Sequence, residues 1–242
     1  VKFQKRTIDT VYKEEMLAGE GQRPWGKTQR EQKEGLEFGK EEYDAINEHC
    51  NEKGIKWSAS AWDCESQEFL REYNLPFNKI ASAIITHEPL LEMVASEGRQ
   101  TYISTGMSTY REIDKAVEIF RSHDCPFTLF HCISTYPAKD EDSNLKVMFS
   151  LQKRYGCDVG YSGHESEALP TILAVALGAS AVERHITLDK TMYGSDQSAS
   201  LGPAELETLV RSLRAIPHIM GDGNKTILEA EKPIAAKLRY WS

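Results

Sequence analysis

The sequence has 242 residues, a length that is typical of one (β/α)8 barrel and sufficient to bury one large core. With 29 Lys and Arg against 37 Asp and Glu, the formal net charge of -8 argues against a general nucleic-acid-binding surface, so an anionic ligand would need a local cationic pocket. The five cysteines lack metal-ligand spacing and no apolar run reaches the about 18 residues that span a bilayer, so we expect free thiols, a cytoplasmic protein and no membrane association.

Short β-rich runs alternate with helical segments along most of the chain. Val1–Gln4 alternates as a strand, whereas residues 7–38 are charged and weakly periodic, so we expect a long loop that is either a lid carrying Trp25 or a solvated insertion. The later predicted strands are 55–60, 78–82, 101–104, 127–132, 158–161 and 181–183. The predicted helices are 41–53, 64–73, 88–97, 110–122, 143–155, 169–177 and 203–220.

This alternation predicts an α/β fold of the TIM (β/α)8 type. Polar residues lie at the ends of nearly every predicted strand, which the mouth of a barrel explains better than the crevice of an open, doubly wound sheet, the structural alternative. After Gly221 the sequence becomes loop-like. We therefore expect a barrel domain over residues 1–222 and a linker over residues 223–242.

The stretch Asp158–Leu201 places two histidines at the ends of neighbouring predicted strands. Because strand side chains alternate, Ser162 and His164 share one face of their segment, and Glu183 and His185 share one face of the next. A strand, helix, strand unit of this length is a right-handed crossover between parallel strands, and ligands bind at the carboxyl ends of such strands. Imidazoles with carboxylates nearby suit a divalent cation that keeps open positions, although one histidine alone is more often structural.

Hydroxyl groups recur at the carboxyl ends of the predicted strands. A single serine there is an ordinary turn residue, but the repetition, together with a lysine that begins an otherwise apolar strand, predicts a ring of donors around a phosphate. The residues of this ring are Ser60, Lys79, Ser82, Ser104, Ser134 and Ser162. We interpret His131, which also lies near the end of a predicted strand, as structural.

Several ordered blocks resemble those of the N-acetylneuraminate (sialic acid) synthase family, which condenses phosphoenolpyruvate with an N-acetylated aldose. The blocks are VKFQKR, WGKT, LEF, PFNKIAS, ISTGM, HCISTYP, GYSGHE, AVALGA, ERHITLDK and GSDQSASL, and they cover nearly all of the chain. The resemblance implies a barrel whose first β/α unit, which carries a catalytic glutamate in the family, is missing from this sequence. It also implies a further C-terminal antifreeze-like domain, which reaches over the partner's barrel in a homodimer of the full-length protein.

The resemblance assigns roles to further side chains. Lys2 and Gln4 would point into the barrel mouth toward the substrates, and Tyr136 would hydrogen-bond the sugar. Glu183 and Asp196 would orient sugar hydroxyls or waters. The ring of serines with its lysine would bind the phosphate of phosphoenolpyruvate.

The metal follows the same resemblance. His164 and His185 would hold Mn²⁺ or Mg²⁺, which would polarise the open-chain aldehyde of the sugar. Gln197 stands where many family members carry histidine, so an acid or base task at that position is in doubt.

The implied reaction joins phosphoenolpyruvate to N-acetylmannosamine or a related N-acetylated hexosamine, and yields a nine-carbon 2-keto acid and phosphate. Two alternatives stay open. One is a barrel that binds ligand without turning it over. The other is a related metal-dependent aldolase or keto-acid phosphate synthase.

Overall fold

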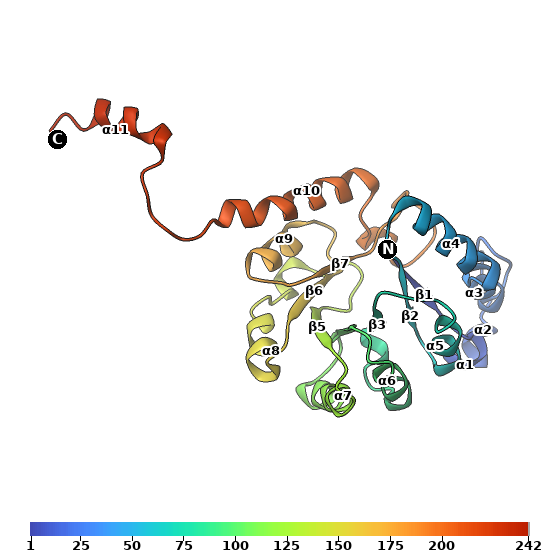
Figure 1. The fold of residues 1–242 in the computed structure, drawn as a ribbon. Helices are drawn as coiled ribbons and strands as arrows, with labels where there is room; N and C mark the ends of the chain where they lie inside the picture. Colours follow the sequence, from blue (N-terminus) through green and yellow to red (C-terminus); the bar gives the residue numbers. More distant parts are fainter. Residues whose placement is uncertain (242) are drawn as a thin grey trace.

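Parallel strands follow one another in chain order around a curved sheet that has helices on its outer face (Figure 1). The computed structural model describes residues 1–241. The strands are β1 (Lys2–Lys5), β2 (Ser58–Ala61), β3 (Asn78–Ile80), β4 (Thr101–Ser104), β5 (Phe127–Cys132), β6 (Val159–Gly163) and β7 (Val182–Arg184). β1 pairs with β2, and β3 to β7 form a five-stranded ladder. The predicted α/β architecture of the barrel type is thereby confirmed.

The helices that connect the strands lie close to their predicted ranges. They are α4 (Lys40–Lys53), α5 (Cys64–Leu70), α6 (Glu88–Ala95), α7 (Tyr110–Ser122), α8 (Val147–Tyr155), α9 (Leu169–Ala176) and α10 (Pro203–Met220). Local signals set their ends: Gly54 closes α4 in the left-handed region at φ 63°, and Glu112 accepts a hydrogen bond from the Thr109 backbone N–H at the start of α7. Single 3₁₀ turns occur at Ser82–Ile84, Asp140–Asp142, Gln197–Ala199 and Glu229–Glu231.

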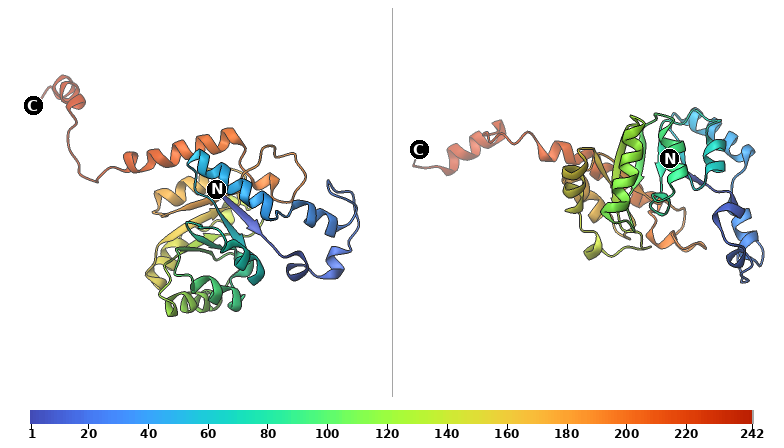
Figure 2. Two further views of the ribbon diagram at one scale, coloured as in Figure 1. Left: turned by 45° about the vertical axis from the view of Figure 1, so that its right-hand side comes forward. Right: turned by 90° about the horizontal axis from the view of Figure 1, so that it is seen from below.

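The segment between β1 and α4 is not the irregular loop that the sequence predicts. It contains α1 (Ile8–Val11), α2 (Glu14–Leu17) and α3 (Gln29–Leu36), which Figure 2 shows beside the barrel beyond the end of β1. Arg30 of α3 forms ion pairs with Asp9 at 2.6 Å and with Glu14 at 2.7 Å, and so connects the three helices. The pattern missed α1 and α2 because helices of one turn are too short to show a hydrophobic period, and it missed the two-turn α3 because that segment is mostly polar.

The C-terminal tail leaves the barrel after α10 and stands away from it in every view (Figures 1 and 2). The prediction of a loop-like tail is wrong over α11 (Lys232–Leu238), which is helical, and residue 242 of the predicted linker lies outside the described residues. Within residues 1–241, no helix has the length and apolar character needed to cross a membrane. The cysteines are free thiols, as expected.

Side chains, not a backbone ladder, join β2 to β3. The buried hydroxyl of Ser58 donates to the Phe77 carbonyl oxygen at 2.6 Å, and that of Ser60 donates to the Lys79 carbonyl oxygen at 3.0 Å. These bonds satisfy acceptors that a neighbouring strand would otherwise pair. They keep β3 beside β2 and thus make one continuous curved wall.

An aromatic cluster fixes the position of β1. Tyr43 of α4 is fully buried against Trp57 and Phe3, and its hydroxyl donates to the Gln4 carbonyl oxygen at 3.0 Å. On the other side of β1, a cavity of about 420 Å³ separates it from β7. The ion pair between Lys2 and Glu183, at 2.9 Å, spans this side of the wall.

Candidate active site

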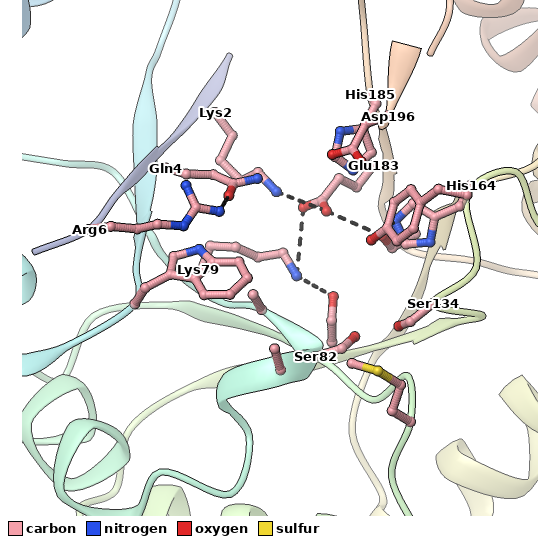
Figure 3. A pocket seen from close by; sticks show the side chains of 17 residues that line it. Lys2, Gln4, Arg6, Lys79, Ser82, Ser134, His164, Glu183, His185 and Asp196 are labelled. Atoms are coloured by element: carbon pink, nitrogen blue, oxygen red, sulfur yellow. Dashed lines mark hydrogen bonds and ion pairs between the residues drawn. The ribbon is translucent and has the colours of Figure 1, made fainter. Parts of the chain in front are cut away.

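One pocket of about 270 Å³ on the inner face of the curved sheet gathers nearly all of the predicted site residues (Figure 3). Those that line it are Lys2, Gln4, Lys79, Ser82, Ser104, Ser134, Tyr136, Ser162, His164, Glu183, His185 and Asp196. They come from all the strands except β2 or from the loops that follow them. Strand alternation and parallel order therefore bring together side chains that are up to 194 positions apart, from Lys2 to Asp196.

Ser60 does not line the pocket, and its assignment to the phosphate ring is wrong. Its hydroxyl donates instead to the Lys79 carbonyl oxygen at 3.0 Å.

We expect Ser60→Ala to lower the free energy of unfolding by about 1 kcal/mol, because one buried carbonyl loses its partner. In steady-state assays its KM for a phosphorylated substrate should stay within about twofold of the unmodified protein, whereas Ser82→Ala should raise KM about tenfold. Equal increases in KM for both variants would contradict this placement.

Glu183 lies at the centre of the charge in the pocket. Its carboxylate is 2.9 Å from the Lys2 ammonium and 3.7 Å from the Lys79 ammonium, and the Ser162 hydroxyl donates to it at 3.2 Å. Burial alone would raise the pKa of Glu183, but the two ammonium groups outweigh that effect and hold the pKa at about 2. The carboxylate is therefore ionised and accepts hydrogen bonds at neutral pH.

Lys79 is the buried cation of the pocket. Burial lowers its pKa to about 8, and the Glu183 carboxylate limits that fall. Its ammonium donates to the Ser104 hydroxyl and, at 3.2 Å, to the Ile80 carbonyl oxygen. An anion that entered the pocket would meet a fixed, poorly hydrated positive charge.

The hydroxyls beside Lys79 are positioned to donate to a ligand. Ser134 has a buried hydroxyl without a hydrogen-bond partner, and Ser82 accepts from the Gly106 N–H at 3.1 Å. A Cβ atom at position 106 would overlap the hydroxyls of both serines, so only glycine leaves room for them. An orphaned buried hydroxyl is costly unless a ligand uses it, and a phosphate oxygen suits this cradle.

Two imidazoles face each other on another side of the pocket. The ring centroids of His164 and His185 are 5.3 Å apart. His164 donates its Nδ1–H to the Ile133 carbonyl oxygen at 2.6 Å, which leaves Nε2 as an acceptor 3.3 Å from the Tyr136 hydroxyl. Burial lowers the pKa of both histidines. The His164 imidazole lowers the pKa of His185 further, to about 4. Both rings are therefore neutral at pH 7, and each has one ring nitrogen that can act as an acceptor.

The donor set fits two positions of a divalent cation. A backbone carbonyl that holds Nδ1–H is the usual support of a histidine that binds a metal through Nε2. No group of three or more His, Cys, Asp or Glu side chains among residues 1–241 is arranged to hold a metal ion, although Asp196 lines the same pocket. Oxygen atoms of substrate and water would have to complete the coordination, as Mn²⁺ and Mg²⁺ accept.

Sequence reasoning missed Arg6 and Trp62, which also line the pocket. The guanidinium of Arg6 stacks 4.1 Å from the centre of the Trp62 ring and donates to the Gln4 side-chain oxygen. A signal was present, since Arg6 continues the alternation of Lys2 and Gln4 by one more step.

Two other residues singled out in the sequence do not reach the pocket. Trp25 packs over Gly35 of α3, and Gln197 lies beside Gly194 on the loop after β7. Neither lines the cavity, so the placement of Trp25 does not support a lid. His131 is structural, as predicted: it is buried and donates Nε2–H to the Ser143 carbonyl oxygen at 2.7 Å.

A buried ion pair behind the pocket fixes β7 against β6. Arg184 points away from its neighbours Glu183 and His185, and its guanidinium lies 3.3 Å from the Glu165 carboxylate, whose exposure is 0%. The hydroxyls of Thr171 and Tyr161 also donate to this carboxylate, at 2.7 Å and 3.2 Å. This network sets the position of the strand that delivers Glu183 and His185.

Comparison with known proteins finds similarity over most of the chain. The sequence model of the NeuB family matches residues 1–225. N-acetylneuraminate-9-phosphate synthase of Mus musculus is 40% identical over 98% of this chain and 67% of that protein. N,N'-diacetyllegionaminic acid synthase of Legionella pneumophila is 35% identical over 99% of this chain and 69% of that protein. The crystal structure of N-acetylneuraminic acid (sialic acid) synthetase from Leptospira borgpetersenii superimposes with a TM-score of 0.83 and 32% identity, over 99% of this chain and 81% of that chain.

Proposed function

Because the chain belongs to the NeuB family, we propose that it condenses phosphoenolpyruvate with an N-acetylated hexosamine, such as N-acetylmannosamine, to give a nine-carbon 2-keto acid of the sialic-acid type and phosphate. The observation that carries this proposal is one pocket that combines a cradle of Lys79 and serine hydroxyls with two neutral imidazoles. The relatives named N-acetylneuraminate-9-phosphate synthase and N,N'-diacetyllegionaminic acid synthase support the reaction type and leave the acceptor open.

The phosphate of phosphoenolpyruvate would occupy the cradle. The Lys79 ammonium and the hydroxyls of Ser82, Ser104 and Ser134 would donate to its oxygens, and Ser162 continues the ring toward Glu183. Donors fixed before the substrate arrives stabilise the negative charge that grows on the leaving phosphate, without reorganisation. They would thus favour departure of phosphate over release of the intact substrate.

The aldehyde of the open-chain sugar would lie against the histidines. His164 and His185 would hold a divalent cation there, and such a cation polarises a carbonyl group as a Lewis acid. Tyr136 and Asp196 line the same side of the pocket and would position sugar hydroxyls. Burial raises the pKa of Tyr136 to about 12, so its hydroxyl stays protonated and donates.

The bonds of the proposed reaction balance as follows. The methylene carbon of phosphoenolpyruvate attacks the aldehyde carbon, so a carbon–carbon bond forms and the carbonyl oxygen takes a proton. Water adds to the cationic enolpyruvyl carbon and gives up a proton. The bond between that carbon and the phosphate oxygen then breaks, which releases phosphate and leaves the 2-keto group. Lys2 and Gln4 would orient phosphoenolpyruvate for the attack, and the ionised Glu183 would orient the water.

A phosphate-release assay tests the proposal. Purified protein is incubated with phosphoenolpyruvate, N-acetylmannosamine or its 6-phosphate, and Mn²⁺ or Mg²⁺, and the product is identified by mass spectrometry. Phosphate should be released only when sugar and cation are both present, and a chelator should stop it. His164→Ala should lower the rate at least about a hundredfold, as expected for loss of a metal ligand, while His49→Ala on the exposed face of α4 should not. Equal phosphate release without sugar would refute the condensation, and ligand binding without any turnover would favour the non-catalytic barrel.

A further inference from the structure

Two N–H donors of the pocket have no acceptor in the protein. The Nε atom of Arg6 and the Nε1 atom of Trp62 are both buried, and neither has a hydrogen-bond partner. Buried donors without acceptors are rare in folded proteins because they lose water without compensation. Since both residues line the pocket, a ligand can supply the missing acceptor.

Arg6 also differs in charge balance from the other cations of the pocket. Lys2 and Lys79 both form ion pairs with Glu183. Among residues 1–241, no carboxylate forms an ion pair with Arg6, whose guanidinium is instead stacked 4.1 Å from the Trp62 ring and bonded to the Gln4 side chain. A planar cation that is held in place and lacks a counter-charge is suited to bind an oxyanion.

The position of this cation points to one end of the acceptor sugar. Figure 3 shows Arg6 and Gln4 on one side of the pocket and His164 and His185 on the other, with the cradle lysine between them. An open-chain aldose carries its aldehyde on one terminal carbon and its last hydroxyl on the other. With the aldehyde against the histidines, the last carbon of the acceptor would extend toward Arg6.

We propose that Arg6 and Trp62 form a second anion subsite, which binds a phosphate ester on the terminal carbon of the acceptor, so that the preferred acceptor is a phosphorylated N-acetylhexosamine. This inference rests on the proposed condensation for the direction in which the sugar lies. Arg6 Nε–H and Trp62 Nε1–H donate to oxygens of the ester. The cradle of Lys79 and serines remains available for the phosphate of phosphoenolpyruvate.

The test compares N-acetylmannosamine 6-phosphate with N-acetylmannosamine, both by calorimetric binding without phosphoenolpyruvate and by kcat/KM. The unmodified protein should prefer the phosphorylated sugar at least about tenfold, and Arg6→Gln should reduce that preference at least about tenfold. Trp62→Phe keeps an aromatic ring but removes the donor, and should reduce the preference about threefold or more. Arg6→Lys, which keeps the charge without the planar fork, should retain an intermediate preference. Arg111→Gln on the exposed side of α7 is the matched control and should leave the preference unchanged.

Three outcomes separate this inference from the condensation itself. If both sugars support turnover and Arg6→Gln keeps the preference of the unmodified protein, the subsite is refuted while the reaction stands. If Arg6→Gln instead raises KM for phosphoenolpyruvate at an unchanged sugar preference, Arg6 serves the other substrate and the subsite is also refuted. If the phosphorylated sugar binds in an Arg6-dependent manner but neither sugar is consumed, the subsite stands and the proposed reaction fails. Thermal unfolding of each variant verifies that it is folded.

Discussion

Replacement of Lys79 by methionine should lower kcat/KM at least about a thousandfold while making the protein more stable to unfolding. The loss of activity follows because the cradle would keep its hydroxyls but lose the charge that we propose binds phosphate. The gain in stability follows because burial lowers the pKa of this lysine from 10.5 to about 8, which means that the folded state disfavours its charge. When the lysine is charged, that shift corresponds to a free energy of unfolding roughly 3 kcal/mol lower than with a neutral side chain at this position.

The pH dependence of this gain has a definite sign. Below pH 8 the lysine is charged in both states, so the cost of burying the charge is present in full. Between pH 8 and 10.5 the unfolded chain binds more protons than the folded one, and the unmodified protein gains stability as pH rises. Urea unfolding at pH 7 and at pH 9.5 should therefore show that the advantage of Lys79→Met shrinks at the higher pH. The exposed Lys53→Met variant is the control, and a gap that widens with pH would contradict the burial argument.

Replacement of Arg184 by methionine should destabilise the fold by about 3–5 kcal/mol, because it leaves the fully buried carboxylate of Glu165 without its counter-charge. The double variant Arg184→Met with Glu165→Leu removes both charges and should recover most of that loss. Thermal and urea unfolding of the two single variants and the double variant give the coupling free energy.

A matched control for that prediction lies on the surface. Arg154 and Asp114 form an ion pair at 2.6 Å between largely exposed side chains, so Arg154→Met should cost no more than about 1 kcal/mol. If Arg154→Met and Arg184→Met cost the same, burial would not be the source of the effect.

The sequence predicted the parts of the site that depend on strand alternation and parallel order. His164 and His185 face the same cavity because each lies at the carboxyl end of a strand, and β6 and β7 are neighbours in the ladder. The same rule placed Ser104 and Ser162 in the pocket with Lys79, whereas Ser82 reaches the pocket from the 3₁₀ turn that follows β3. None of these placements required knowledge of side-chain packing.

Where a placement depends on contacts between distant segments, the pattern gave the wrong answer or none. Ser60 satisfies the alternation rule, yet its hydroxyl bonds to a neighbouring strand, because β2 and β3 lack a backbone ladder. Arg6 reads as part of a charged segment, and only its stacking on Trp62 shows that it is held in the pocket. The one-turn helices α1 and α2 contact α3 through ion pairs with Arg30, which no local pattern reveals.

The link between Lys2 and Glu183 joins the two strands that border the open side of the wall, β1 and β7. Lys2 also lines the pocket, so a single ammonium group both connects β1 to β7 and is available to a ligand in the pocket. An anion that bound beside Lys2 would compete with Glu183 for the same ammonium group. Binding of such an anion would therefore be thermodynamically linked to the contact between β1 and β7.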